Sequence, residues 1–334
     1  MVKILAIETS CDETAAAVVE DGRKILSNVV ASQVDLHKRF GGVVPEIASR
    51  SHQEVINPVI KEALETTGLE YSALDALAVT LGPGLPGALI VGVATAKAIA
   101  YAIKKPLIGV NHLEGHLFAN YLQHPQVKTP LIALIVSGGH TLLAYVKDWG
   151  EYEVLGQTLD DAAGEAFDKI AKFLGMGYPG GAVLSKMAET GDPRAIDFPR
   201  AMMGSGDFNF SLSGLKTAVI NYITKNKESI TDDDLPDICA SFEAAIVDVQ
   251  VSKSIKAAKS RNVGTLILAG GVGANNRLRS ELEKASKSSN IKFFYPSISL
   301  CTDNAAMIAS AAYFHYLRKD FLTLAVESQP NMGL

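Results

Sequence analysis

Short runs of apolar residues separated by polar turns open the chain and predict a β-meander. The runs occupy residues 3–7, 15–19 and 25–30, and an Asp-Gly pair marks the second turn. The first turn, residues 8–14, is rich in hydroxyl and carboxylate groups. We therefore expect three short strands, with chemistry-bearing side chains gathered between the first two.

The same strand, polar turn, strand pattern returns near the middle of the chain. Apolar residues fill 131–136 and 142–146, and the turn between them reads Ser-Gly-Gly-His-Thr. The two units share this pattern but not their sequence. The recurrence predicts a duplicated architecture.

Helical periodicity and helix-length apolar runs follow most of the other strands. We expect helices over 45–67, 88–103, from 112 onward, and over 160–174, 237–259, 275–285 and 302–319. We expect further strands at 76–80, 107–110, 266–269 and 292–295. Residues 192–212 and the tail after 321 have no regular pattern. Strands that alternate with helices predict an α/β fold.

Length and composition indicate a globular protein with two lobes. The chain has 334 residues, of which 48% are hydrophobic and 20% charged, and single hydrophobic cores stop growing at about 250–300 residues. We expect an N-terminal lobe of residues 1–110 closed by residues 300–330, and a second lobe of residues 111–299.

The charge balance argues against a stand-alone nucleic-acid-binding protein. The formal net charge is −5, whereas such proteins are usually strongly basic. If this chain binds nucleic acid, it needs a local basic patch or a helper subunit.

Cysteine usage and the apolar segments predict a cytoplasmic protein. The three cysteines, Cys11, Cys239 and Cys301, lie far apart and lack CxxC spacing, which fits a reducing compartment. The first residues predict a strand and not a signal peptide. The most apolar stretch, 88–103, is shorter than the roughly 20 residues of a membrane-spanning helix. We interpret it as a buried helix and expect no membrane association.

Two histidines four residues apart, His112 and His116, follow a predicted strand. On a helix this spacing places both imidazoles on one face, where they can bind the same ion. Zinc proteases share the spacing but carry a general-base Glu directly after the first His. Here that position is Leu113, and Glu114 points to another side, which argues against a peptidase. The alternative is a pair of surface or capping histidines.

A third ligand has to come from a distant segment, and Asp303 is the candidate. It lies at the start of the last predicted helix, where a carboxylate can equally serve as a helix cap. Two imidazoles and one carboxylate with open coordination positions suit Fe²⁺ or Zn²⁺. Cys301 is a weaker candidate ligand.

Two glycine-rich loops predict an anion or nucleotide site. One, residues 137–139, lies between two strands, and the other, residues 270–273 with Gly271, precedes a helix that begins near Asn275. Glycine lets backbone N–H groups approach phosphate oxygens, and a helix N-terminus favours anions. Neither loop has Rossmann or P-loop spacing. A plain hairpin turn is the alternative for the first loop.

Carboxylate and hydroxyl groups elsewhere are candidates for contacts with the same ligand. Asp168 precedes a third glycine segment, 175–181, and could bind a ribose hydroxyl or instead pair with Lys172 on the helix surface. Glu8 and Ser10, in the first polar turn, could position Mg²⁺ or a water beside a phosphate. A solvent-exposed polar turn is their alternative.

Taken in order, these motifs make the chain resemble the TsaD family of tRNA-modifying proteins, once described as O-sialoglycoprotein endopeptidases. The resemblance runs nearly end to end. The chain looks like the bacterial form of the family, which lacks an attached kinase domain. It is carried by the motifs at 8–14 (ETSCDET), 41–46 (GGVVPE), 82–84 (GPG), 112–116 (HLEGH), 137–141 (SGGHT), 160–168 (DDAAGEAFD), 178–181 (YPGG), 210–217 (FSLSGLKT) and 301–304 (CTDN).

The resemblance implies an α/β fold of the actin, Hsp70 and sugar-kinase type (ASKHA), with duplicated ribonuclease-H-like lobes around a nucleotide cleft. It implies an acyltransferase that moves the threonylcarbamoyl group from threonylcarbamoyl-AMP to N6 of adenosine 37 in tRNAs that read ANN codons, releasing AMP. The implied partners are tRNA, a TsaB-like paralogue, a TsaE-like P-loop ATPase and an upstream synthase that makes threonylcarbamoyl-AMP.

The resemblance also implies roles for individual residues. It implies that His112, His116 and Asp303 bind one divalent metal per subunit, Fe²⁺ or alternatively Zn²⁺. We expect these three residues and Glu8 to be the catalytic residues. The expected adenylate is threonylcarbamoyl-AMP, or ATP with Mg²⁺. Together with Ser10 and Gly271 from the polar turn and the second loop, the expected adenylate-binding residues are Ile135, Val136, Ser137, Gly138, Gly139, Asp168, Gly181 and Asn275.

One position departs from the family pattern. Residue 185 is serine here, where many relatives carry an acidic residue that reaches the ribose, so Asp168 is expected to take more of that role. Three other functions are alternatives: a metal-dependent peptidase, an actin-like ATPase or carbohydrate kinase, and a non-catalytic scaffold.

Overall fold

The computed structural model describes residues 1–334, which divide into two compact units. Unit 1 comprises Met1–Val127 and Pro296–Leu334, and unit 2 comprises Lys128–Tyr295. We expected the N-terminal lobe to end at residue 110 and to resume at residue 300. Unit 1 instead extends to Val127 and resumes at Pro296. The reason at the first boundary is that helix α4 (His112–Gln123) packs against the C-terminal helix α11 (Ala305–Arg318).

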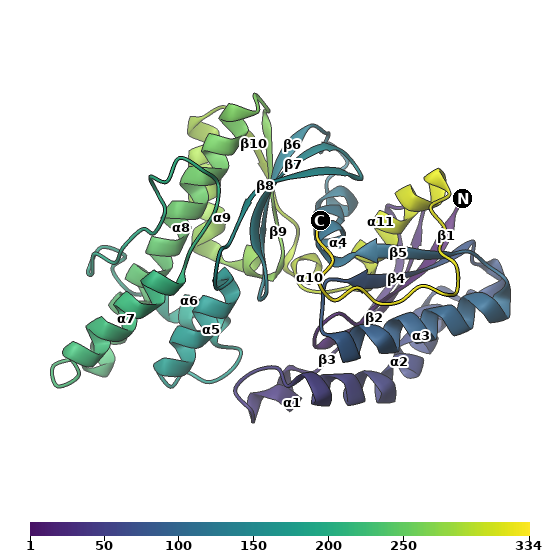
Figure 1. Cartoon of the computed structure of the whole chain (residues 1–334), viewed down its shortest axis with the longest axis horizontal. Helices are drawn as coiled ribbons and strands as arrows, with labels where there is room; N and C mark the ends of the chain where they lie inside the picture. The colour runs from purple at the N-terminus through teal and green to yellow at the C-terminus, as the bar shows by residue number, and fades with distance from the viewer. The chain divides into compact units, whose positions relative to one another are not determined.

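Unit 1 is built on a five-stranded sheet with the order β3-β2-β1-β4-β5. An antiparallel meander of three strands continues into two parallel strands. The strands are β1 (Lys3–Glu8), β2 (Glu13–Glu20), β3 (Lys24–Ser32), β4 (Ala76–Gly82) and β5 (Leu107–Asn111). Helices α2 (Pro45–Thr67) and α3 (Pro86–Ile103) cover one face of the sheet, and α4 and α11 cover the other (Figure 1). Two short helices, α1 (Val34–Lys38) and α10 (Ile298–Cys301), complete the unit.

Unit 2 repeats the plan with the strand order β10-β9-β6-β7-β8. Its strands are β6 (Leu131–Val136), β7 (Thr141–Asp148), β8 (Glu151–Gln157), β9 (Thr265–Ala269) and β10 (Lys292–Phe294). Again a three-stranded antiparallel meander is extended by two parallel strands. Its helices are α5 (Ala163–Phe173), α6 (Gly180–Ala188), α7 (Ser213–Lys225), α8 (Leu235–Ser260) and α9 (Asn276–Ser288). The predicted duplication and the α/β class are therefore confirmed.

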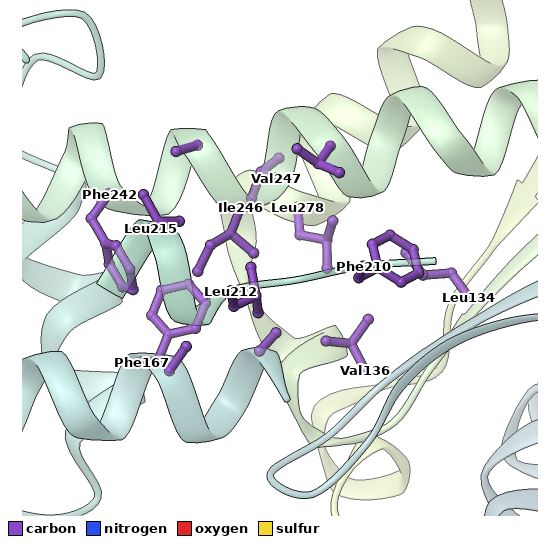
Figure 2. Packing of buried hydrophobic residues seen from close by; sticks show 14 of the residues in the cluster. Leu134, Val136, Phe167, Phe210, Leu212, Leu215, Phe242, Ile246, Val247 and Leu278 are labelled. Carbon is purple, nitrogen blue, oxygen red and sulfur yellow. The ribbon is translucent and has the colours of Figure 1, made fainter. Parts of the chain in front are cut away.

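The core of unit 2 joins its helices to its sheet. Phe167 on α5 meets Phe242 on α8 edge to face, with ring centroids 5.3 Å apart, and Leu134 and Val136 of β6 pack into the same cluster (Figure 2). Such aromatic pairs add about 0.5–1.5 kcal/mol to the burial of their surface. This packing fixes α5 and α8 rigidly, and both helices contribute to the candidate site of this unit.

Several elements begin elsewhere than predicted, or were not predicted. Helix α5 starts at Ala163 and not at 160, because the Asp160 carboxylate accepts hydrogen bonds from the hydroxyls of Ser211 and Ser213 and from backbone N–H groups at the start of α7. Helix α11 starts at Ala305 and not at 302, because the Asn304 side chain caps it. Strand β8 and helices α1, α6 and α7 lacked a clear sequence signal.

Backbone hydrogen bonds hold the tail after residue 321 against unit 1, and a hydropathy pattern does not predict such bonds. The N–H of Leu322 donates to the carbonyl of Leu107 at 2.8 Å, and the N–H of Gln329 donates to the carbonyl of Leu81 at 2.7 Å. The tail therefore runs along the β4–β5 edge of unit 1.

Helix α3 is the one helix long and apolar enough by composition to cross a membrane. Its buried residues face the sheet of unit 1, and it packs against β4 and α2. The core helix of a protein outside the membrane passes the same test, although only 39% of this helix is buried.

Candidate functional site

Helix α4 begins directly at the end of strand β5, so its first turn lies at the edge of the sheet of unit 1. The Asn111 side chain caps it by accepting a hydrogen bond from the N–H of Leu113 at 2.8 Å. His112 is the first residue of the helix, and His116 follows one turn later. The two histidines therefore lie one turn apart on a helix, as predicted, and their ring centroids are 4.7 Å apart.

Asp303 reaches the two histidines from the loop between α10 and α11. Its Oδ1 lies 3.2 Å from Nε2 of His116 and 3.5 Å from Nε2 of His112. One potential ligand atom from each residue lies within 4.8 Å of the others. These three residues, which we call the His₂Asp cluster, could hold one metal ion, as the sequence predicted.

Glu8 and Ser10 hold His112 from the side opposite Asp303. The Nδ1 atom of His112 lies 3.2 Å from Oε2 of Glu8 and 3.1 Å from Oγ of Ser10. Glu8 is fully buried, and its carboxylate also accepts hydrogen bonds from the N–H of Ser10 and the hydroxyl of Thr80, each at 2.5 Å. Carboxylates that bind the second nitrogen of a metal-ligating histidine fix its tautomer and orientation.

The electrostatics of the cluster favour positive charge. Burial opposes a charged imidazole, but the carboxylates of Asp303 and Glu8 outweigh it and raise the pKa of His112 to about 9. Burial likewise opposes ionisation of Glu8, yet His112 holds the pKa of that carboxyl below its ordinary value. A site that stabilises a proton in this way is equally suited to a cation.

His116 supplies the observation that a metal fits here. Its side chain is fully buried, and neither of its ring nitrogens makes a hydrogen bond. Buried polar atoms are nearly always satisfied, because leaving one unpaired costs about 1–3 kcal/mol. A metal ion bound through Nε2, beside Asp303, would satisfy one of these two nitrogens.

Glu114 is occupied elsewhere, and this bears on the peptidase alternative. Its Oε2 lies 3.0 Å from Nε2 of His315 on α11. A metallopeptidase needs a carboxylate that acts on metal-bound water. The structure therefore gives Glu114 a partner in the core and no such role.

Unit 2 contains a cavity of about 800 Å³. This is within the usual size range of small-molecule sites. Five of the predicted adenylate-binding residues line it: Gly138, Asp168, Gly181, Gly271 and Asn275. The sequence thus selected residues from α5, α6, α9 and two glycine loops that the fold does bring together.

Other residues predicted for adenylate binding lie outside the cavity wall. The side chains of Ile135 and Val136 are buried in strand β6, so these residues can offer only backbone groups. Ser137 and Gly139 belong to the same loop as Gly138, where the Ser137 hydroxyl accepts a hydrogen bond from the N–H of His140 at 3.1 Å. Ser10 belongs to unit 1 and lies beside His112.

Close backbone contacts explain two glycines of unit 2: Gly164, which lines the cavity, and Gly270, which follows strand β9. A Cβ at Gly164 would come within 2.7 Å of the Cα of Gly138 and of the carbonyl oxygen of Ser137. Gly270 has a φ of +89°, and a Cβ there would lie 2.4 Å from the carbonyl of Val136. The loops can therefore approach one another only without side chains.

The Asp168 carboxylate is directed at the start of α6. Its Oδ1 accepts a hydrogen bond from the N–H of Gly181 at 2.8 Å. This contact ties α5 to the N-terminus of α6, where unpaired N–H groups favour anions.

Glu243, on α8, lines the same cavity and was not predicted. It is 4% exposed, and its Oε1 accepts a hydrogen bond from Nδ2 of Asn275 at 2.5 Å. Burial raises the pKa of Glu243, although hydrogen bonds from Asn275 and Ser185 oppose the rise. The available signal was a single carboxylate inside an otherwise small and apolar helical run, residues 238–247.

Solved structures with the same fold have unrelated sequences. HypF from T. kodakarensis matches 96% of this chain with 48% of its own length, a TM-score of 0.66 and 14% identity. Component A of (R)-2-hydroxyglutaryl-CoA dehydratase from Acidaminococcus fermentans matches 96% of this chain with its whole length, a TM-score of 0.57 and 15% identity. The duplicated sheets thus define an α/β protein of the actin-like ASKHA class.

The sequence comparisons identify the family within this class. The model of TsaD, "tRNA N6-adenosine threonylcarbamoyltransferase", matches residues 24–310. Proteins of that name from Clostridium novyi (strain NT) and Moorella thermoacetica are 53% and 54% identical. The alignments cover 100% and 99% of this chain, and 98% and 97% of those relatives. The chain belongs to the TsaD family.

Proposed function

We propose that this chain transfers the threonylcarbamoyl group of threonylcarbamoyl-AMP to N6 of adenosine 37 in tRNAs that read ANN codons. Family membership over the full chain is the observation that carries the proposal. The two candidate sites supply the chemistry that such a reaction needs: a cation site in unit 1 and a nucleotide-sized cavity in unit 2.

In the proposed reaction the N6 lone pair attacks the carbamoyl carbon. A C–N bond forms, the bond from that carbon to the phosphate oxygen of AMP breaks, and the amine loses one proton. The bond electrons leave with AMP, so no oxidant or reductant is needed. A target base in an anticodon loop is unstacked and accessible.

We propose that His112, His116 and Asp303 hold one divalent metal, with Fe²⁺ favoured and Zn²⁺ as the alternative. Two imidazoles and one carboxylate with open positions are typical of non-haem Fe²⁺ sites. When bound, the ion would act as a Lewis acid for carbonyl or phosphate oxygens. Glu8 and Ser10 would orient His112 through its Nδ1 atom, so Glu8 is a positioning residue in this proposal.

In unit 2, the proposed ligand is threonylcarbamoyl-AMP, or ATP with Mg²⁺. Backbone N–H groups at Gly138 and Gly271 would receive phosphate oxygens, because N–H groups can approach closely there, whereas the N–H of Gly181 already donates to Asp168. Asp168 would hold the start of α6 in place and accept from the ribose. We further propose the cytoplasm as the location, and as partners tRNA, a TsaB-like paralogue, a TsaE-like P-loop ATPase and an upstream synthase of threonylcarbamoyl-AMP.

Reconstitution tests this function. The chain is combined with threonine, bicarbonate, ATP, the synthase, both partner proteins and unmodified tRNA, and modified adenosine is measured by mass spectrometry. We expect product with the wild-type chain and a loss of at least roughly a hundredfold with His116→Ala. His124→Ala, at the end of the same helix, is the matched control. Absence of product with the wild-type chain would contradict the proposal.

A further inference from the structure

Glu243 combines deep burial with a place in the wall of the unit 2 cavity. It belongs to the buried run of α8, is 4% exposed, and yet lines the cavity. No lysine, arginine or histidine nitrogen lies within 4.0 Å of its carboxylate; Arg277 acts on it only through its field. Buried carboxylates are rarely left without a cation, because desolvation costs several kcal/mol.

The orientation of Glu243 is set by Asn275. The Nδ2 atom of Asn275 donates to Oε1 of Glu243 at 2.5 Å and to Oγ of Ser185 at 2.9 Å, which uses both of its hydrogens. Its Oδ1 accepts from the N–H of Leu278 and caps α9. The Asn275 amide therefore has no donor left for a ligand, and it holds Glu243 and Ser185 in fixed positions.

The cavity offers different chemistry to the two ends of a nucleotide. Gly138 and Gly271, from the two glycine loops, present backbone without side chains, which suits phosphates, whereas the N–H of Gly181 already donates to Asp168. A carboxylate repels phosphates and accepts from donors. Glu243 must then face the nucleoside, whose ribose hydroxyls and amino group are donors.

The neighbours of Glu243 favour a contact with the ribose hydroxyls over one with the amino group of the base. Ser185 follows Gly181 by one turn of α6, so it lies on the same helix face. Gly181 is held by Asp168, the predicted ribose residue, and Ser185 shares the Asn275 amide with Glu243. Asp168 and the Glu243–Asn275 pair therefore contact α6 one helical turn apart, at Gly181 and at Ser185.

We propose that Glu243 is a nucleoside-binding residue of this chain, whose carboxylate accepts a hydrogen bond from a ribose hydroxyl of the bound adenylate. The inference rests on the proposed binding of a nucleotide in unit 2. It assigns Asn275 and Ser185 to holding that carboxylate, so Asn275 acts on the ligand through Glu243 and not by direct donation.

Calorimetric titration of the full chain with ATP, 2′,3′-dideoxy-ATP and ITP tests the proposal. We compare the wild type with Glu243→Gln, with the shortened Glu243→Asp, and with Glu283→Gln, which alters an exposed residue of α9 outside this cavity. We expect Glu243→Gln to weaken ATP binding by roughly ten- to a hundredfold. It should leave the affinity for dideoxy-ATP unchanged or raised, and Glu283→Gln should bind as the wild type does.

The direction of the change in ATP affinity distinguishes a ribose contact from a residue that only contributes negative charge. If Glu243 only contributes charge, its neutralisation reduces repulsion with the triphosphate and ATP binds more tightly, which overturns the proposal. Equal losses for ATP and dideoxy-ATP, or a loss that disappears with ITP, overturn the ribose contact. If Glu243→Gln does not fold, Glu243→Asp must show the same selective loss for ATP. If the wild-type chain binds neither ATP nor dideoxy-ATP, nucleotide binding in unit 2 itself fails, and that result is distinct from the others.

Discussion

The Nε2 atom of His116 lies 3.2 Å from Oδ1 of Asp303, and His116 makes no hydrogen bond through either ring nitrogen. The approach brings together the start of α4 and the loop before α11, which are far apart in the sequence. A fully buried imidazole next to a carboxylate, without a hydrogen bond of its own, is arranged for a cation between them. The first prediction follows from this pair.

Replacing Asp303 by alanine is expected to lower the affinity of the chain for Fe²⁺ and Zn²⁺ by at least roughly a hundredfold, because one of three ligands is lost. Metal content after dialysis, measured by plasma mass spectrometry, checks this. His124→Ala, at the residue that follows the same helix and outside the cluster, should retain the wild-type metal content. Equal metal content in Asp303→Ala and the wild type would show that Asp303 is only a loop residue.

Glu8→Gln tests the support of His112 separately from the ligands. The neutral amide no longer stabilises an N–H at Nδ1 of His112. We expect metal affinity to fall by roughly ten- to a hundredfold while the fold is kept, since Gln has the size of Glu and its amide oxygen can still accept from the N–H of Ser10. The amide NH2 then takes the position that faces Thr80 and His112. Zn²⁺ titration against a chelating indicator measures the change. Unchanged affinity would contradict the positioning role.

Gly164→Ala is expected to disturb the glycine loop of unit 2, because the new Cβ would meet the backbone of Ser137 and Gly138 at 2.7 Å. We expect a loss of about 1–3 kcal/mol in the free energy of unfolding, as for other overpacked positions, and weaker nucleotide binding. Gly214→Ala is a close control, since Gly214 is also the second residue of a helix and nothing lies within 4 Å of its Cβ position. Urea titration should show a lower free energy of unfolding than in the wild type for Gly164→Ala and a higher one for Gly214→Ala.

Lys253→Met should loosen the segment before α7. The Lys253 ammonium is 1% exposed and donates to the carbonyls of Asp207 and Asn209 and to the hydroxyl of Ser205. Its removal leaves these acceptors without their donor, and we expect a cost of about 2–4 kcal/mol. Hydrogen exchange of residues 204–210 should rise, whereas Lys256→Met, exposed on the same helix, should leave exchange there as in the wild type.

The Asp160 cap makes a contribution to stability that depends on pH. Partial burial opposes ionisation, but hydrogen bonds from Ser211 and Ser213 outweigh it and lower the pKa of Asp160 to about 2. Because the folded pKa is below the ordinary value, the contribution is complete above about pH 4 and is lost as the pH falls toward 2. We expect Asp160→Asn to cost about 1 kcal/mol at pH 7 and to approach the wild type only below about pH 2. A constant difference across this range would contradict the cap.

The sequence by itself determined the repeated meanders, the α/β class and the two histidines on one helix face. These features depend on local periodicity and on spacing, which the chain carries in consecutive residues. The second glycine loop could also be predicted, because only glycine permits the positive φ and the close backbone contact at Gly270.

Only the tertiary structure decided which distant groups meet. Asp303 could have been a helix cap, but the cap is Asn304, and Asp303 lies beside His116. Asn275 lines the cavity of unit 2, and its side chain makes hydrogen bonds to Glu243, Ser185 and the start of α9. Whether a carboxylate or an amide is free or occupied depends on packing between segments far apart in the chain, and that packing leaves no periodic trace in the sequence.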